Sequence, residues 1–350
     1  GEINSRDCLA RECEIWNDNP PDSDNVLKFI DQQQITPGFD RFMDYLRDSN
    51  IKARVLSEGF DFYIVRILDS AGFGDIEKIT NKAAYENGII IPRFPHFGEG
   101  CGRCSNCKGY HIGKIAKPFE SVIFIGDGHS DAHACEKADI IFAKSFLKEH
   151  LENSGIFYFG YNDFDDILST FRVLAGKSVF LVSKRMRLCV QSNRHRAQLQ
   201  SLWESGEVMK YVGFPNGLGW SAEKHEKNWK RISADRENIY LALEDENGRF
   251  LGEAMLAAPD QDNVCAHDLK LLPEYWGKGL AKEAWEEMLA AGVRRWPGTK
   301  SEVTPSVENG RALRLYRSLG FVPDGDEGIW DPDSKIPNAV PVRYVRMLRE

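Results

Sequence analysis

The sequence predicts an α/β protein of two domains: an N-terminal doubly wound, Rossmann-like parallel sheet and a C-terminal domain built on a mixed sheet. The chain has 350 residues, of which 42% are hydrophobic, and this length is enough to bury two cores. In the first half, apolar runs alternate with helical stretches, as in a parallel sheet covered by helices. In the second half, a hairpin pattern precedes a strand, a glycine-rich turn and a helix. We place the boundary near residue 178, with domains over 1–177 and 178–350.

Short runs of apolar and β-branched residues mark the strands of the first domain. Residues 121–127 are the clearest case, because a buried parallel strand is apolar on both faces. Functional groups of such sheets lie at the carboxyl ends of the strands, where Ser57 and Asp127 fall. The expected elements are, in order, a strand over 51–57, a strand over 121–127, a helix over 131–137 and a strand over 139–143.

The second domain begins after a helix that Gly176 terminates. Asn247 and Gly248 lie between two apolar runs, which is typical of a hairpin turn. The expected elements are a strand over 187–190, a helical region over 197–231, and two strands over 238–243 and 250–256 that this turn connects.

The composition excludes several classes of protein. The net charge of −8 falls almost wholly on residues 1–175, and this acidic half repels nucleic acid, while basic runs such as 184–187 are read as solvated surface. No apolar run approaches the roughly 18 residues that a membrane helix needs. Eight cysteines do not make the dense framework of a small secreted domain, so we expect a reducing, cytoplasmic compartment. The first residue is Gly1 and not Met, so we expect that the chain was processed or that its beginning is missing.

The segment from Leu271 to Ala281 is the most informative in the chain. A strand through Leu271 enters a turn with Gly277 and Gly279, and a helix begins directly after it. Glycines let the backbone approach a ligand closely, and a helix N-terminus offers free N–H donors and a partial positive charge. The turn is therefore an anion-binding site, unless it is only a glycine-rich connection with nothing bound.

A second segment further along the chain favours the binding interpretation. A strand there ends before Asn309, and the helix that follows carries Tyr316 and stops at a Leu-Gly-Phe sequence. Together the two segments resemble the acetyl-CoA core of the GNAT acyltransferase superfamily, over residues 185–349. The chain has Tyr275 or Trp276 where that superfamily carries its first basic residue, a departure that is tolerated because the backbone does the binding.

This resemblance implies acetyl-CoA as the cosubstrate and a small-molecule or peptide amine as the acceptor, which would enter near the hairpin and the helical region before it. Asn309 would contact the pantetheine arm or the start of its own helix. Tyr316 would protonate the departing thiolate, unless it is an aromatic residue of the core. Glu302, His267 and Asp268 are candidates to accept the proton of the amine, and catalysis by positioning alone stays open. The backbone N–H groups expected to hold the CoA pyrophosphate are those of Trp276, Gly277, Lys278, Gly279, Leu280 and Ala281, directly after Leu271.

The first domain carries another group of candidate residues. Asp127 and Asp131 stand four residues apart across a glycine turn, and such paired carboxylates suit Mg²⁺. Ser57 ends its strand ready to bond a phosphate, and Lys108 is able to neutralise one. Residues 1–172 thus resemble haloacid-dehalogenase-superfamily phosphatases, nearest to the phosphoserine phosphatase and methionine-salvage enolphosphate phosphatase branch. The resemblance implies a phosphomonoester substrate, with Ser57, Lys108 and Asp127 in the catalytic site and both aspartates at the metal.

The motif that supplies the nucleophile of that superfamily is absent. Its leading Asp, in Asp-x-Asp-x-Thr, forms an aspartyl-phosphate, and no such sequence precedes Ser57. Residues 1–35 read instead like the helical cap that follows the first strand, so we expect the chain to start inside the fold with its sheet incomplete there. Two alternatives stay open: a phosphatase whose nucleophile lies upstream, and a degenerate module that binds partners or acts as a scaffold.

A cluster of cysteines lies in a glycine-rich turn of the first domain. Cys101, Cys104 and Cys107 have Cys-x-x-Cys-x-x-Cys spacing, with His96 and His111 on either side. Thiolate and imidazole are ligands of tetrahedral Zn²⁺, so the cluster predicts a zinc site of His96 and the three cysteines. Free thiols or a redox pair are the alternatives.

Overall fold

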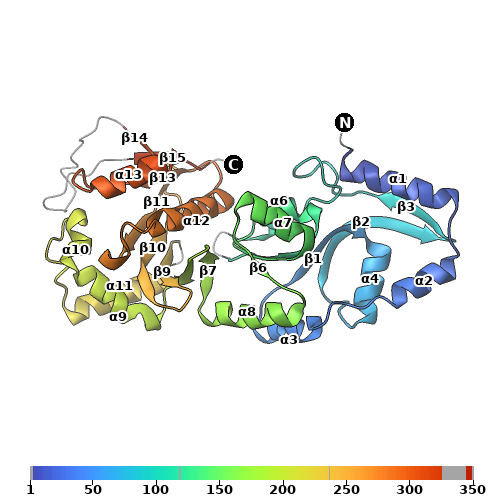
Figure 1. Cartoon of the computed structure of the whole chain (residues 1–350), viewed down its shortest axis with the longest axis horizontal. Coiled ribbons are helices and arrows are strands. Elements are labelled where there is room, and N and C mark those ends of the chain that lie inside the picture. The colour runs from blue at the N-terminus through green and yellow to red at the C-terminus, as the bar shows by residue number, and fades with distance from the viewer. Residues whose placement is uncertain (1–2, 118–119, 236, 325–343, 349–350) are drawn as a thin grey trace. The chain divides into compact units, whose positions relative to one another are not determined.

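The computed structural model of the chain describes residues 3–117, 120–235, 237–324 and 344–348 (Figure 1). The chain divides into two compact units, one of residues 1–116 and 122–173 and the other of residues 117–121 and 174–350. Part of the stretch that resembles acyltransferases, residues 325–343, lies outside the described residues. Among the described helices, none combines the length and the apolar character that crossing a membrane requires.

The first unit contains two three-stranded sheets. In one, β1 pairs in parallel with β2, which pairs antiparallel with β3; in the other, β4, β5 and β6 are all parallel. The expected α/β class with parallel strands is confirmed, although the described strands form two sheets and not one continuous sheet. The strands are β1 (Arg54–Phe60), β2 (Glu77–Glu86), β3 (Ile89–Arg93), β4 (Ile123–Gly126), β5 (Ile140–Ala143) and β6 (Phe159–Gly160).

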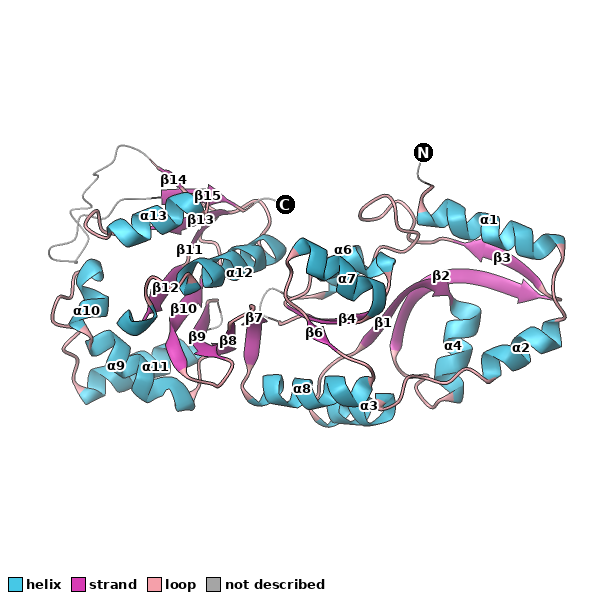
Figure 2. Cartoon of the chain, viewed as in Figure 1, coloured by secondary structure: helices cyan, strands magenta, loops and turns pink. Residues whose placement is uncertain are grey.

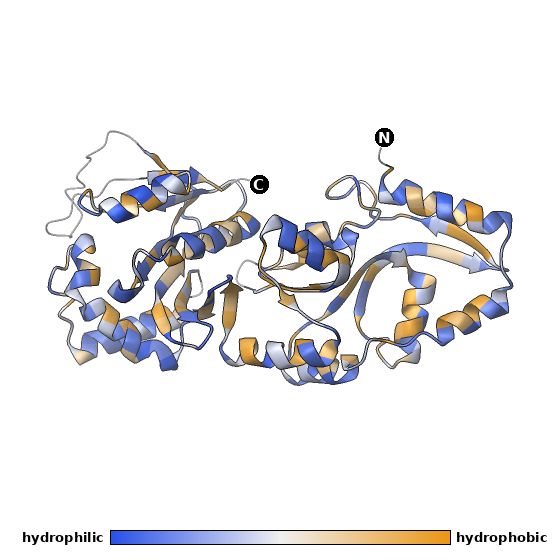
Figure 3. Cartoon of the chain, viewed as in Figure 1, coloured by the Kyte–Doolittle hydropathy of each residue, from blue (hydrophilic) through white to orange (hydrophobic). Residues whose placement is uncertain are grey.

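Helices connect these strands and cover them. Asn4 and Asp22 cap the first two helices by accepting hydrogen bonds from the N–H groups of Asp7 and Asn25. The described residues up to 35 are thus mainly helical, as expected. Figure 3 shows apolar and polar bands alternating along α1 and α8, as expected for helices with one buried face. The helices are α1 (Ser5–Asp18), α2 (Ser23–Asp31), α3 (Phe39–Asp48), α4 (Asp61–Ser70), α5 (Lys108–Ile115), η1 (His129–Asp131), α6 (Ala132–Cys135), α7 (Ser145–Ser154) and α8 (Phe164–Gly176).

The second unit is built on an antiparallel sheet of order β12-β10-β9-β8-β7 and a mixed sheet of order β11-β13-β15-β14. The mixed sheet confirms the expectation for this half, and Gly248, with φ +80°, lies in the turn that joins β9 to β10. The strands are β7 (Val179–Val182), β8 (Met186–Val190), β9 (Ile239–Asp245), β10 (Phe250–Leu256), β11 (Val264–Ala266), β12 (Asp268–Leu271), β13 (Lys300–Val303), β14 (Val322–Pro323) and β15 (Tyr344–Met347).

The two sheets of this unit share one stretch of chain. β11 pairs in parallel with β13, but after His267 the same chain continues as β12 and pairs with β10 instead. The strand therefore leaves β13 at this point. Strand β12 separates this divergence from the turn that carries Gly277 and Gly279.

One hydrophobic core joins both sheets of the second unit to α12. Trp285 of this helix is fully buried among residues such as Leu188 and Leu241 of the antiparallel sheet and Tyr344 of the mixed sheet. This packing fixes the position of the helix whose first turn follows the two glycines (Figure 2). The helices are η2 (Asn193–His195), α9 (Arg196–Glu204), α10 (Gly206–Met209), η3 (Lys210–Val212), α11 (Ala222–Ala234), η4 (Pro273–Tyr275), α12 (Leu280–Arg295) and α13 (Gly310–Ser318).

Candidate functional sites

The glycine turn between β12 and α12 has a backbone that requires glycine. Gly277 and Gly279 have φ values of +74° and +77°, in the left-handed region that residues with a Cβ rarely adopt. A Cβ added to Gly277 would meet no atom within 4 Å, so conformation and not lack of space demands glycine there. We refer to the backbone from Gly277 to Ala281 as the cradle.

The cradle presents free donors at the N-terminus of a long helix. The N–H groups of Leu280 and Ala281 lie in the first turn of the 16-residue helix α12, where an α-helix has no internal acceptor for them. The helix dipole adds partial positive charge at the same place. Trp276 differs from our expectation, because its N–H already donates to the carbonyl oxygen of Pro273 at 3.1 Å. Its indole Nε1 donates to the carbonyl oxygen of Leu271 at 2.8 Å, which ties the turn to the end of β12.

Arg185, in the turn between β7 and β8, is bonded both to the cradle and to α12. Its Nε donates to Glu283 Oε2 at 2.7 Å and its Nη1 to the carbonyl oxygen of Lys278 at 2.9 Å. Burial raises the pKa of Glu283, but hydrogen bonds from Ser183 and Arg185 outweigh it and hold that pKa below its usual value. We expected residues 184–187 to be solvated surface, but Arg185 has these two bonding partners. Both lie too far along the chain from Arg185 to be found from the sequence.

Asn309 and Tyr316 lie on the same helix, α13, at its start and near its end. Asn309 Oδ1 accepts from the N–H of Ala312 at 3.1 Å, so its side chain contacts the helix start, one of its two expected contacts. The ring of Tyr316 stands perpendicular to that of Trp285, with 5.4 Å between centroids. Burial raises the pKa of the Tyr316 phenol, and the charge of Asp268 raises it further, so the hydroxyl stays protonated at neutral pH.

A partly buried charge cluster lies beside Tyr316 on β10 and β12. Lys270 Nζ is bonded to Asp268 and lies 3.4 Å from Glu253 Oε1, which also accepts from Trp203 Nε1 at 2.8 Å. Burial alone would lower the pKa of Lys270, but the two carboxylates raise it above its usual value. No pattern in the sequence marks Glu253 or Lys270 as a functional residue. Their opposite charges become neighbours only through the register that pairs them across β10 and β12.

The three candidate proton acceptors differ in their surroundings. Glu302 lies on β13, paired in register with Ala266 of β11. His267 is buried; its Nδ1 accepts from the N–H of Ala257 at 3.0 Å, and burial lowers its pKa to about 4. Asp268 is half exposed, and its negative charge raises the pKa of the Tyr316 phenol.

In the first unit, three of the expected phosphatase-like residues come together. Lys108, the first residue of α5, is bonded through Nζ to Asp131 and to Ser130 Oγ, the latter at 3.1 Å. Asp131 Oδ2 accepts from the N–H groups of Asp127 at 2.9 Å and Gly128 at 2.8 Å. Asp131 is 3% exposed and fully bonded, whereas Asp127 is exposed.

This arrangement tests the expected Mg²⁺ site. A magnesium ion held by both carboxylates would displace the Lys108 ammonium that now neutralises Asp131. The two aspartates as arranged here therefore do not fit a two-carboxylate magnesium site, and Asp127 alone is open to a cation.

Ser57 lies on β1 and is connected to the cysteine-rich loop by Asn106. Ser57 Oγ accepts from the N–H of Gly59 at 3.0 Å, and its carbonyl oxygen accepts from Asn106 Nδ2 at 2.8 Å. The same Nδ2 donates to the carbonyl oxygen of Ile79 at 3.0 Å, so Asn106 joins β1 to β2. His111 is turned toward Asn106, with Nε2 at 2.6 Å from its Oδ1. No signal in the sequence marks Asn106 beyond its place before Lys108.

The cysteine cluster contains a different histidine from the one we expected. Within the described residues, Cys101, Cys104 and Cys107 form a group with His133, and their ligand atoms all lie within 4.8 Å of one another. His96 instead has its Nδ1 at 3.1 Å from Glu99 Oε2. The imidazole that joins the cysteines thus comes from α6, and not from the segment before the loop.

Comparison with known proteins identifies both halves. A family model described as an acetyltransferase (GNAT) domain matches residues 185–322. A 2-hydroxy-3-keto-5-methylthiopentenyl-1-phosphate phosphatase of Bacillus cereus (strain B4264) is 30% identical over 155 residues, which cover 43% of this chain and 70% of the relative. The chain belongs to this phosphatase family. A relative of the same name from Bacillus thuringiensis (strain Al Hakam) is 31% identical over 151 residues, 41% of this chain and 67% of the relative. The chain is therefore a GNAT acetyltransferase domain joined to a phosphatase-like region.

Solved structures resemble the chain more distantly. A spermidine N-acetyltransferase from Vibrio cholerae in complex with CoA and spermine is 19% identical, with a TM-score of 0.41, and the match covers 47% of this chain and 94% of that chain. A GNAT-family acetyltransferase from Bacillus anthracis is 17% identical, with a TM-score of 0.41, over 48% and 98% of the two chains. Scores at this level are too low to support an inference about this chain.

Proposed function

We propose that the GNAT domain transfers an acetyl group from acetyl-CoA to an amine of a small molecule or peptide. The cradle is the observation that carries this proposal. Two glycines in the left-handed region turn the backbone so that free N–H groups of α12 face one place, and a pyrophosphate is an anion of the size and charge that such a helix start binds. Arg185 and Trp276 hold the turn in this shape before any ligand arrives.

The proposed reaction follows from the groups around Tyr316. The amine nitrogen attacks the thioester carbonyl carbon, the C–N bond forms and the C–S bond breaks. The departing CoA sulfur takes a proton from the Tyr316 hydroxyl, which burial keeps protonated at neutral pH. An acceptor that arrives as an ammonium ion first releases one proton to water. The amine nitrogen then loses one further proton as the sulfur gains one, so the tyrosine regains its proton from the acceptor through water or Asp268.

The charge cluster beside Tyr316 supports an amine as the acceptor. Glu253 and Asp268 together carry two negative charges, and Lys270 neutralises one of them. The remaining negative charge lies next to the proposed general acid and attracts a cationic substrate. An anionic acceptor would be repelled at the same place.

Titration calorimetry of the full chain with acetyl-CoA tests the proposal, followed by an assay of CoA release with a panel of primary amines. We expect binding with a Kd on the order of 1–100 μM and CoA release that depends on the amine, in the usual range for an enzyme and its substrate. A folded protein that neither binds acetyl-CoA nor releases CoA would contradict it.

We also propose that the phosphatase-like region binds a phosphomonoester through Lys108 and Ser57. The bonded, largely buried position of Lys108 supports this, because it fixes one ammonium beside Asp131 and Ser130 at the start of α5. The proposal concerns binding of the phosphomonoester, which Lys108 and Ser57 would carry out.

Inorganic phosphate is the probe for this second site. Lys108→Met should weaken its binding at least tenfold, because the variant removes the only charge-assisted donor that we assign to the phosphate. Lys114→Met, on the exposed face of the same helix, is the matched control and should bind phosphate like the wild type. Equal binding by the wild type and Lys108→Met, or none by the wild type, would contradict the proposal.

A further inference from the structure

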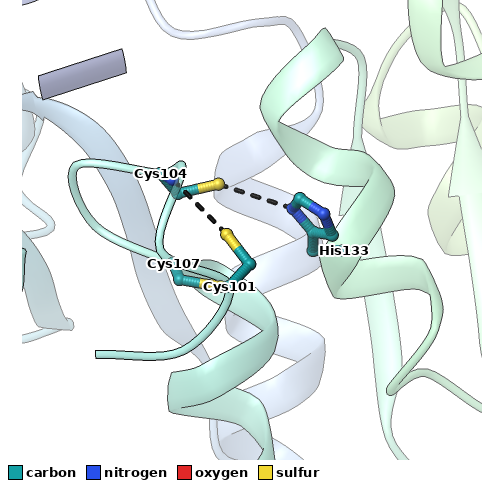
Figure 4. Close-up of side chains that lie close together, drawn as sticks. All are labelled: Cys101, Cys104, Cys107 and His133. Carbon is teal, nitrogen blue, oxygen red and sulfur yellow. Dashed lines mark hydrogen bonds between the residues drawn. The ribbon is translucent and has the colours of Figure 1, made fainter. Parts of the chain in front are cut away.

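The side chains of Cys101, Cys104, Cys107 and His133 converge on one point in the first unit. Figure 4 shows Cys104 directed toward the imidazole of His133 on α6, with Cys101 and Cys107 beside it. Cys104 Sγ lies 3.5 Å from His133 Nδ1, and the N–H of Cys104 donates to Cys101 Sγ at 3.4 Å. Cys104 and Cys107 are buried, whereas Cys101 is exposed at the edge of the group.

The geometry points to a Zn²⁺ site with three thiolates and the Nδ1 of His133 as ligands. A tetrahedral zinc with Zn–S of about 2.3 Å and Zn–N of about 2.0 Å places sulfur and nitrogen ligands about 3.5 Å apart. Cys104 Sγ and His133 Nδ1 already have this separation. All four ligand atoms lie within 4.8 Å of one another, so small side-chain rotations would bring the others to one ion.

The loop backbone is shaped around the sulfur atoms. Gly100 and Gly102 have φ values of +80° and +72°, which allow the chain to reverse between the cysteines. A Cβ on Gly100 would lie 2.9 Å from Cys107 Sγ, so the loop closes too tightly on this sulfur for any side chain at that position. Three thiols in one turn with an imidazole form a complete tetrahedral set, whereas a disulfide between two of them would leave the third thiol and the imidazole unused.

The proposed ion would join two segments that are distant in the sequence. Cys107 directly precedes Lys108, and His133 follows Asp131 by two residues. The close approach of the two segments is visible at Gly109, where a Cβ would lie 2.3 Å from the carbonyl oxygen of His133. Zinc would therefore stabilise the contact between Lys108 and Asp131. The zinc site itself does not depend on whether phosphate binds there.

Metal analysis of the full chain tests the site directly. Protein purified without chelators should contain about one zinc per chain by plasma mass spectrometry. After replacement of the metal by Co²⁺, the protein should show thiolate-to-cobalt charge-transfer bands and the strong visible bands of tetrahedral cobalt. A folded wild-type chain that holds no zinc and gives no cobalt spectrum would overturn the proposal.

Two pairs of variants test the ligand set. His133→Ala should weaken Zn²⁺ binding at least tenfold and change the visible cobalt bands, while His96→Ala should leave both unchanged. Cys104→Ser should lose the metal, while Cys135→Ser, a buried cysteine of α6 outside the group, should retain it. Circular dichroism identifies variants that fail to fold. Retention of the wild-type cobalt spectrum by folded His133→Ala, with its loss in His96→Ala, would overturn the assignment of His133.

Discussion

Tyr316→Phe should lower kcat for acetyl transfer by about 10²-fold or more, the usual contribution of a general acid, and leave the Kd of acetyl-CoA within about twofold of the wild type. The variant removes one oxygen atom and keeps the ring that packs against Trp285. Binding of acetyl-CoA depends on the cradle, whereas protonation of the departing CoA sulfur depends on the Tyr316 hydroxyl. Stopped assays of CoA release and calorimetry with acetyl-CoA measure the two effects separately.

The pH profile gives a second readout for Tyr316. Tyr316 acts as a general acid only while its phenol is protonated. Because the pKa of this phenol is raised above its usual value of 10, the phenol stays protonated through pH 7–10. We therefore expect wild-type kcat to rise or stay level over this range, with no fall from loss of the tyrosine proton. A fall below pH 9 that disappears in Tyr316→Phe would contradict the raised pKa.

Tyr344→Phe is the matched control for loss of a buried hydroxyl. Tyr344 lies in the same core, and its hydroxyl accepts from Arg317 Nη2 at 2.9 Å. It should lose some stability but keep kcat. If both variants lost activity to the same extent, the role of Tyr316 would be structural and the general-acid assignment would be wrong.

The features that the sequence predicts well are those that depend on neighbouring residues. An apolar run such as 140–143 is buried at every position, and the Asn-Gly pair forms its hairpin turn. Gly277 and Gly279 could be found because a strand, two glycines and a helix start follow one another along the chain. Positive φ at both positions is a local property of the backbone, so local sequence is enough to indicate it.

The features that the sequence does not predict depend on contacts between distant segments. His96 is closer to the cysteines in sequence than His133, but the fold brings α6 and not residue 96 to the loop. Glu253 and Lys270 pair through strand register, and Arg185 reaches Glu283 across nearly a hundred positions. Each of these side chains is charged or polar, and the sequence alone would place each on the surface. Their partners come from distant segments that only the tertiary structure brings close.

The cradle provides the prediction that most directly tests acetyl-CoA binding. Gly277→Val should weaken acetyl-CoA binding at least tenfold, because a residue with a Cβ in the left-handed region costs about 1–2 kcal/mol and a changed turn no longer directs its N–H groups at one anion. Gly279→Val should act in the same way, since Gly279 precedes the first residue of α12. Calorimetry with acetyl-CoA measures the loss.

Gly298→Val separates this effect from a general loss of stability. Gly298 has a φ of +82°, and a Cβ there would also meet no atom within 4 Å, so the local backbone cost matches that at Gly277. Gly298 lies in the turn between α12 and β13, at the opposite end of α12 from the cradle. The two variants should therefore lose similar stability in urea unfolding, but only Gly277→Val should lose acetyl-CoA. Equal weakening of binding in both would mean that the turn after β12 supports the fold without holding the pyrophosphate, because the two sites share their backbone strain and differ only in what their N–H groups face.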